Sequence, residues 1–114
     1  MKILVTGGAG FIGTWIRRDL LARGHSALVL DHQDRRHLLA DGEEFFLGDV
    51  RDPTAVTEAA AHVDGIIHLA AVLGTQETIT NPRPSAETNI IGSLNVFEAA
   101  AQYNLPTVYA GVGN

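Results

Sequence analysis

The glycine-rich segment near the start of the chain constrains the fold more than any other feature. It runs from Thr6 to Gly13 with the sequence TGGAGFIG, and the short apolar run Ile3 to Val5 precedes it. That run is typical of a strand buried on both faces. Because apolar residues at helical spacing follow the glycines, the segment lies between a predicted strand and a predicted helix. This order is the beginning of a strand–helix–strand unit.

The glycines of this turn fit two registers, Gly7/Gly10/Gly13 and Gly8/Gly10/Gly13, of which the second has the G-x-G-x-x-G pattern. The first glycine permits a tight turn, and Gly10 lets the backbone approach a pyrophosphate. Gly13 lets the helix pack close to the strand. The N-terminus of the helix offers unpaired N–H groups and the positive end of its dipole to the phosphates. The turn is therefore a candidate dinucleotide site.

Alternating strand and helix patterns continue along the chain. The first helix has apolar residues at positions 12, 15, 16 and 20. It is expected to end near Arg23, with Gly24 as a left-handed C′ residue. A second helix should begin with Asp52 as its cap and Pro53 at its first position, and it should run to about His62. The predicted strands are 3–5, 27–30, 45–47, 66–69 and one that begins at residue 107.

Three further segments complete the prediction. Residues 32–43 are polar, with one helical turn expected at about 36–40, and residues 72–84 are predicted to form a long loop. A longer helix follows, whose apolar stripe comprises Ile90, Leu94, Phe97 and Ala101. The alternation predicts an α/β fold, a doubly wound Rossmann-type parallel sheet of about five strands in the order 3-2-1-4-5, with helices on both faces. Residues 1–114 are expected to form one domain, since no linker divides them.

Composition and charge exclude several other classes of function. The net charge of −5 disfavours a nucleic-acid partner or an anionic membrane surface. No cysteine is present to form a disulfide, a thiolate metal site or a cysteine nucleophile, and the histidines show no metal-ligand spacing. The first apolar run is too short for a signal peptide, and no stretch approaches the roughly 18 apolar residues of a membrane span. We expect a cytoplasmic protein without a metal.

Asp31 at the end of the second predicted strand indicates which dinucleotide the turn would hold. It lies 18 residues after Gly13, close to the expected spacing of about 20. Its carboxylate can accept hydrogen bonds from the adenosine ribose hydroxyls and would repel a 2′-phosphate. NAD is therefore favoured over NADP, although Arg35 and Arg36 weaken that preference. No Gly-Lys-Ser/Thr follows the turn, which excludes a Walker-type loop, whereas the glycines alone leave an S-adenosylmethionine site open.

Later motifs decide among these alternatives. Together with the TGGAGFIG turn and Asp31, the chain carries GDVRD at 48–52, HLAA at 68–71 and NIIGSLNV at 89–96. With this series it resembles the extended short-chain dehydrogenase/reductase family, in particular its NAD-dependent nucleotide-sugar epimerases and dehydratases, over essentially all 114 residues. The resemblance implies an NAD cofactor and, in a full-length protein, a nucleotide-sugar substrate.

The resemblance also implies roles for individual residues. Asp49 and Val50 would contact the adenine ring, and residues 69–71 would line the cofactor where it crosses the strand ends. Asn89 is expected to tie its helix to the neighbouring strand backbone. His68 is expected to be a hydrogen-bonded core residue, with a catalytic role as the alternative. The predicted cofactor-binding residues are Gly7, Gly10, Phe11, Ile12, Gly13, Asp31, Asp49, Val50, Leu69, Ala70 and Ala71.

The catalytic residues of this family are missing from the chain. Its members use a Tyr-x-x-x-Lys pair as general acid and base with a nearby Ser or Thr, but here no tyrosine is followed by a lysine four residues later. We therefore predict no catalytic residue and expect the N-terminal part of a longer enzyme, in which Asn114 borders the active site. The alternative is a non-catalytic dinucleotide-binding or redox-sensing module. Surfaces meant for a missing half would favour association, including a homodimer.

Overall fold

The computed structural model describes residues 1–70 and 80–110. Its first half contains β1 (Lys2–Thr6), α1 (Phe11–Ala22), β2 (Ser26–Asp31), the 3₁₀ turn η1 (Arg36–Leu38) and β3 (Glu43–Leu47). Its second half contains α2 (Pro53–Ala60), β4 (Gly65–His68), α4 (Pro82–Ala86), the π-helical η2 (Glu87–Ile91), α5 (Gly92–Tyr103) and β5 (Thr107–Tyr109). Strands and helices alternate as predicted.

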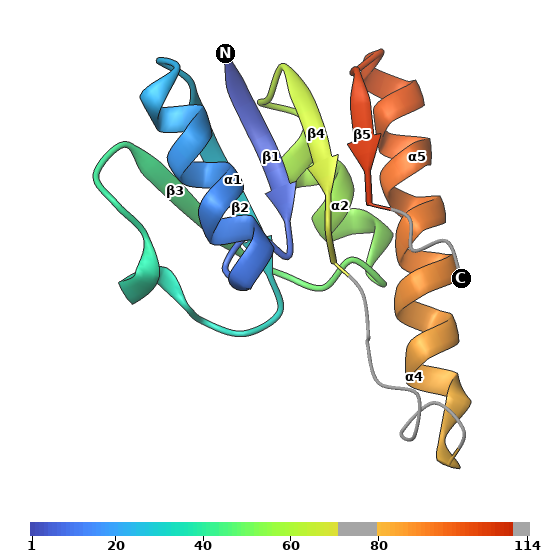
Figure 1. Cartoon of the computed structure of the whole chain (residues 1–114). Helices are drawn as coiled ribbons and strands as arrows, with labels where there is room; N and C mark the ends of the chain where they lie inside the picture. Colours follow the sequence, from blue (N-terminus) through green and yellow to red (C-terminus); the bar gives the residue numbers. More distant parts are fainter. Residues whose placement is uncertain (71–79, 111–114) are drawn as a thin grey trace.

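The five described strands form one parallel sheet in the order β3-β2-β1-β4-β5. The predicted strand order is thereby confirmed. Strand β1 is central, with Val5 opposite Val29 of β2 and Ile67 of β4. Because all strands are parallel, their C-terminal ends lie along one edge (Figure 1). The glycine turn follows β1 at this edge, and Asp31 is the last residue of β2.

Local capping follows the sequence closely. Helix α1 ends at Ala22, with Arg23 as C-cap, and Gly24 has a φ of +83° as expected of its C′ position. Asp52 caps α2 by accepting a hydrogen bond from the Thr54 N–H, with Pro53 in the first turn. The left-handed residue that ends α5 is Asn104, with a φ of +53°, which was not among the predicted helix ends.

The predicted loop at 72–84 is partly wrong. Residues 72–79 lie outside the described residues, but α4 begins at Pro82, inside the segment that was expected to be loop. The two prolines that suggested a loop lie in the first turn of α4. There the missing N–H of proline leaves no hydrogen bond unmade, and its fixed φ suits the helix.

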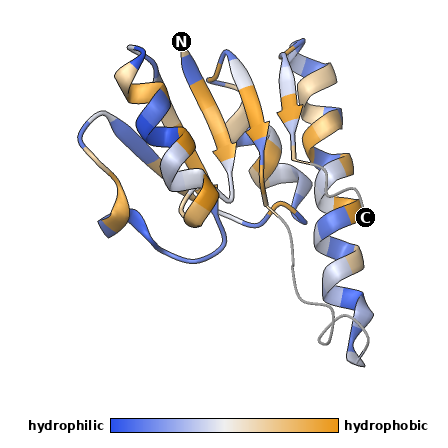
Figure 2. Ribbon diagram, in the orientation of Figure 1, coloured by the Kyte–Doolittle hydropathy of each residue, from blue (hydrophilic) through white to orange (hydrophobic). Residues whose placement is uncertain are grey.

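The helices cover the two faces of the sheet unequally. Helices α2 and α5 pack on one face, where twelve described apolar residues form the larger core cluster. Helix α1 covers the other, where the buried cluster comprises only Ile3, Val5 and Ala27. In Figure 2 the hydrophobic colour is concentrated on β1 and β4, between these helices. The predicted apolar series of α1 also meets solvent in part, since Ile12 and Trp15 are 61% and 59% exposed.

The apolar stripe predicted for the long helix does not face the core. Ile90, Leu94 and Phe97 are 66%, 49% and 40% exposed, and Ala101 is exposed as well. The residues that α5 buries are Gly92, Asn95, Val96, Ala99 and Ala100. Small side chains allow the close approach to the sheet and α2, so the larger apolar residues remain on the outer face. Among the described residues, no helix is long and apolar enough to cross a membrane.

Candidate functional site

A pocket lies at the edge of the sheet where the strands end. Its volume is about 740 Å³, within the range of roughly 300–1,000 Å³ that is common for ligand sites. Ten of the eleven predicted cofactor-binding residues line it, and the eleventh, Ala71, lies outside the described residues. The lining residues that sequence reasoning did not select are Leu30, His32, Arg35, Gly48, Arg51, Pro84, Thr88 and Ala110.

The glycine turn is held by backbone contacts that only glycine permits. Gly7 has a φ of +66°, and a Cβ on it would lie 2.9 Å from the Cα of Ala70. A Cβ on Gly13 would lie 2.5 Å from the carbonyl oxygen of Gly8. Gly7 therefore takes the tight-turn position that the two sequence registers left open. The strand β1, the turn and the first residues of α1 consequently form one closely packed unit.

The N-terminus of α1 opens from this unit toward the pocket. Its N-cap is Gly10, which supplies no side-chain hydrogen bond, and the first turn contains no acidic residue. Gly10, Phe11, Ile12 and Gly13 all line the pocket. The first N–H groups of a helix have no partner within the helix, and they carry the positive end of its dipole. This end of the pocket suits an anionic group such as a phosphate.

Asp31 brings a carboxylate to the pocket at the end of β2. It is only 8% exposed, and its Oδ1 accepts a hydrogen bond from the Gln33 N–H at 3.2 Å. Of the two arginines considered from sequence, Arg35 lines the pocket and donates to Gln33 Oε1 at 2.6 Å. Arg36 is not among the lining residues, and its side chain donates to Asp34 at 2.8 Å.

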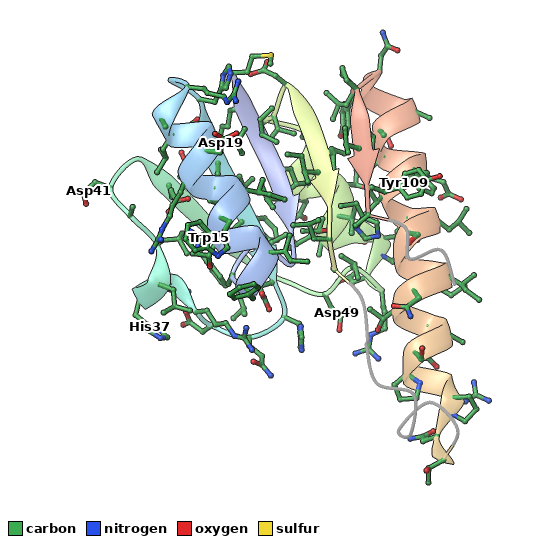
Figure 3. All side chains as sticks on the ribbon, viewed as in Figure 1. Trp15, Asp19, His37, Asp41, Asp49 and Tyr109 are labelled. Atoms are coloured by element: carbon green, nitrogen blue, oxygen red, sulfur yellow. The ribbon has the colours of Figure 1, made fainter. Side chains whose placement is uncertain are left out.

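Asp49 and Arg51 form a charged pair that lines the pocket after the end of β3, and Asp49 is labelled in Figure 3. Arg51 Nη2 donates to Asp49 Oδ2 at 2.6 Å, and its Nη1 reaches Glu87 of η2 at 3.4 Å. The Arg51 guanidinium lowers the pKa of Asp49, and Asp49 raises the pKa of Arg51. The carboxylate of Asp49 therefore stays ionised at neutral pH.

Helix α5 fixes the segment that follows Asp49. Asn95 is 9% exposed and its Nδ2 donates to the carbonyl of Val50 at 2.9 Å. A Cβ on Gly92 would lie 2.7 Å from Val50 Cγ2. Asn89 was predicted to tie the helix to a strand, and its Nδ2 donates to Ser85 Oγ at 3.2 Å. Sequence reasoning missed Asn95, although an amide among the small residues of an otherwise apolar helix face was a visible signal.

His68 lies in a buried hydrogen-bond network behind the pocket. Thr6 Oγ1 accepts from the N–H of Ala70 at 3.2 Å and shares the N–H of Leu69, at 3.0 Å, with the Thr6 carbonyl oxygen, so N–H donors are directed at both of its lone pairs. Its hydrogen is therefore donated to His68 Nδ1, 2.6 Å away. His68 is consequently neutral and protonated on Nε2, which donates to Ser93 Oγ at 2.9 Å.

Burial lowers the pKa of His68 and favours the same neutral form. Through Thr6, this network holds the backbone N–H groups of Leu69 and Ala70, two of the lining residues. The geometry agrees with a core role for His68. Among the described residues, no group of three or more His, Cys, Asp or Glu side chains could hold a metal ion.

The parallel sheet, the glycine turn and the acidic residue after β2 together define a dinucleotide-binding α/β domain of the Rossmann type. Comparison with known proteins gives the family. The NAD dependent epimerase/dehydratase family matches residues 3–112, and the chain belongs to it.

Individual relatives agree with this assignment. A bifunctional UDP-glucose 4-epimerase and UDP-xylose 4-epimerase of Pisum sativum is 33% identical over an alignment of 118 positions, gaps included. The alignment covers 90% of this chain and 34% of the relative. A dTDP-glucose 4,6-dehydratase of Mycobacterium tuberculosis is 36% identical over 114 residues, which cover 92% of this chain and 34% of the relative.

A solved structure shows the same arrangement. The UDP-glucose 4-epimerase of Thermus thermophilus in complex with NAD superposes with a TM-score of 0.85 and 39% identity, over 92% of this chain and 35% of that one. The chain thus spans about a third of the length of the relatives that it matches.

Proposed function

We propose that this chain is the NAD-binding part of a nucleotide-sugar epimerase or dehydratase. The observation that carries the proposal is the gathering of ten predicted cofactor residues around one pocket. These residues come from four separate strand ends and from α1, so their meeting depends on the whole sheet. The relative from T. thermophilus, with the same sheet, is in complex with NAD, which supports this choice of cofactor.

Each part of the pocket has a distinct task in this proposal. The turn from Gly7 to Gly13 binds the pyrophosphate with backbone N–H groups. Asp31 accepts hydrogen bonds from the adenosine ribose, while Asp49 and Val50 contact the adenine. Bound NAD would supply hydride transfer at its nicotinamide ring. The backbone at Leu69 and Ala70, held by Thr6, borders the cofactor between its two halves.

The acid–base half of the reaction requires residues that this chain lacks. Its tyrosines, Tyr103 and Tyr109, are not followed by a lysine at the fourth position, and Lys2 is its single lysine. We therefore expect the 114 residues to bind NAD and to epimerise or dehydrate nothing. Epimerisation or dehydration of a UDP- or dTDP-sugar by this polypeptide would contradict that expectation.

The missing Tyr-x-x-x-Lys pair also favours a second candidate, a non-catalytic dinucleotide-binding or redox-sensing module. The two candidates differ in the coding sequence after Asn114. A Tyr-x-x-x-Lys a short distance downstream supports the enzyme with a nucleotide-sugar substrate. A stop codon directly after Asn114 supports the module.

Isothermal titration with NAD and NADP tests the cofactor. We expect NAD to bind at least tenfold more tightly, because Asp31 accepts from the ribose hydroxyls and repels a 2′-phosphate. Asp31→Asn should reduce this ratio of affinities by about tenfold, because one hydrogen bond to a charged group contributes about that factor to a binding constant. The matched control is Asp34→Asn, since Asp34 lies three residues away and does not line the described pocket. A chain that binds neither dinucleotide contradicts the proposal.

The proposal extends to a homodimer and to a cytoplasmic protein. The outer face of η2 and α5 exposes Ile90, Leu94 and Phe97, and exposed apolar residues at helical spacing favour association between copies. Sedimentation velocity should show dimer formation that increases with concentration and is reduced by Leu94→Asp. Leu38→Asp, at a leucine that is 50% exposed in η1, should leave it unchanged. A monomer at all concentrations contradicts the dimer.

A further inference from the structure

Helix α1 buries a charged side chain beside the glycine turn. The side chain of Arg17 is 3% exposed, and its Nε donates to the carbonyl oxygen of Gly8 at 2.7 Å. Its Nη1 donates to Oε1 of Glu43, the first residue of β3, at 2.5 Å. The Glu43 side chain is 1% exposed. Neither residue lines the described pocket.

Stability alone gives a weak reason for this ion pair. Removing two charges from water carries a desolvation penalty that their attraction offsets only when the remaining polar atoms are satisfied. Glu43 Oε1 also accepts from the Ala40 N–H at 2.7 Å, but Oε2 is buried without a hydrogen-bond partner among the described residues. Such an incompletely satisfied group calls for another explanation.

The contacts of Arg17 converge on the carbonyl groups of the turn. Besides the bond to Gly8, Nη2 lies 3.4 Å from Thr14 Oγ1, which donates to the carbonyl of Gly10 at 2.8 Å. Gly8 and Gly10 have no side chains that could hold them in place. Arg17, with Thr14 as an intermediate, thus contacts alternate peptide groups of the turn.

The orientation of a carbonyl decides where the next N–H points. In a planar trans peptide the C=O and the N–H point in opposite directions. When Arg17 holds the Gly8 carbonyl toward the protein interior, the N–H of Ala9 is directed away from the buried guanidinium. The Gly10 carbonyl accepts both the N–H of Thr14, at 3.0 Å, and its hydroxyl, and these two bonds have the same effect on the N–H of Phe11. Gly10 and Phe11 line the pocket, whereas Ala9, which joins the Gly8 peptide to Gly10, is 4% exposed and is not among the lining residues.

We propose that Arg17 is a positioning residue for the pyrophosphate of the dinucleotide. Glu43 fixes the guanidinium, which fixes the Gly8 carbonyl and so presents the amides of the turn to the phosphates. This inference rests on the proposed function. It predicts that loss of the ion pair lowers the affinity for ligands that contain a pyrophosphate. Adenosine, whose predicted contacts are with Asp31, Asp49 and Val50, should be almost unaffected.

The variant Arg17→Met/Glu43→Leu separates positioning from stability. Replacing both charges by apolar side chains of similar volume is often neutral for stability, so we expect a thermal midpoint close to that of the unmodified chain. The affinity for ADP-ribose, measured by isothermal titration, should fall about tenfold, as for the loss of a hydrogen bond from a charged donor. Adenosine affinity, measured by NMR titration, should change less than twofold. The control is Arg18→Met, an exposed arginine that lies over Trp15 on the same helix.

Arg17→Lys provides a second test if the double variant does not fold. Lysine keeps the positive charge near Glu43 but lacks the planar fork that contacts Gly8 and Glu43 together, so ADP-ribose should again bind more weakly while adenosine does not. Unchanged ADP-ribose affinity in a folded variant, or equal losses for both ligands, overturns the inference.

Failure of the proposed function would be recognised separately, because the unmodified chain would then bind no ADP-ribose. The positioning role would still be tested by amide hydrogen exchange at Gly10, whose N–H donates to Gly7 at 3.2 Å. Exchange at this amide should be faster in the double variant, and unchanged exchange contradicts the role.

Discussion

The two faces of the sheet are held by different kinds of interaction. On the face under α2 and α5, twelve described apolar residues form one buried cluster, whereas the buried cluster on the α1 face has three members. The α1 face instead contains the close approach of Gly13 to Gly8 and the buried pair of Arg17 and Glu43. Apolar packing is non-directional, whereas backbone contact and ion pairs fix orientation. We call the face under α1 the directional face, and it is the face that carries the glycine turn.

The largest effect should come from the apolar face. Leu4 is completely buried in the larger cluster, so Leu4→Ala should lower the free energy of unfolding by about 3 kcal/mol through lost transfer energy and a cavity. Leu94→Ala is the matched control, because Leu94 is 49% exposed on α5; its effect should stay below about 0.5 kcal/mol. Urea denaturation measures both. Equal losses would mean that α5 turns its other face to the core.

Backbone proximity on the α1 face gives the next effect. Gly13→Ala places a Cβ 2.5 Å from the Gly8 carbonyl oxygen, and relieving this clash should lower the free energy of unfolding by about 2 kcal/mol. Gly10→Ala meets only the Gly7 oxygen, at 3.4 Å. It should change stability by less than about 0.5 kcal/mol and yet weaken NAD binding, because Gly10 lines the pocket where we propose that the pyrophosphate binds. Thermal melts and NAD titrations of both variants distinguish these effects, and a stable Gly13→Ala protein would contradict the close packing.

A smaller, pH-dependent effect tests the polar contact between β4 and α5. Burial lowers the pKa of His68 below its ordinary value of 6.5, so below pH 6.5 the unfolded chain binds more protons than the folded one. Stability should therefore decrease as the pH falls below that value, by at most about 1.4 kcal/mol per pH unit. The lowered pKa of Asp49 acts in a separate window, because its contribution is lost only below about pH 3.8.

His68→Gln should remove this slope below pH 6.5, as measured by chemical denaturation at several pH values. His62→Gln, at an exposed histidine after α2, should keep the slope of the unmodified chain. If His68→Gln retained the full slope, the assignment of His68 as a neutral side chain that accepts a hydrogen bond from Thr6 would be wrong.

The sequence was sufficient to predict the sheet and most of the element boundaries. Alternating apolar runs indicated the strand order, while Gly24, Asp52 and Pro53 marked helix ends through well-understood capping chemistry. The site residues could be selected because they lie at or after the C-terminal ends of strands in a parallel sheet, which meet along one edge, or in the helix that begins there.

The orientation of the helices could not be predicted in the same way. Periodicity counts apolar residues, and so it selected Trp15 and Leu94, which are exposed, over Arg17 and Asn95, which are buried. Arg17 is buried because Glu43, 26 residues later, supplies a partner. Asn95 is buried because it reaches the Val50 carbonyl. Both depend on tertiary contacts that no local pattern in the sequence contains.

One measurement tests the central claim that the directional face presents an NAD site. A titration of the isotopically labelled chain with NAD, followed by amide NMR, maps the bound ligand onto the sequence. We predict shifts at residues 7–13, 31, 49–50 and 69–70, with α2 (Pro53–Ala60) unchanged. Binding that leaves the amides of the glycine turn unshifted, or that shifts mainly the exposed face of α5, would contradict the account.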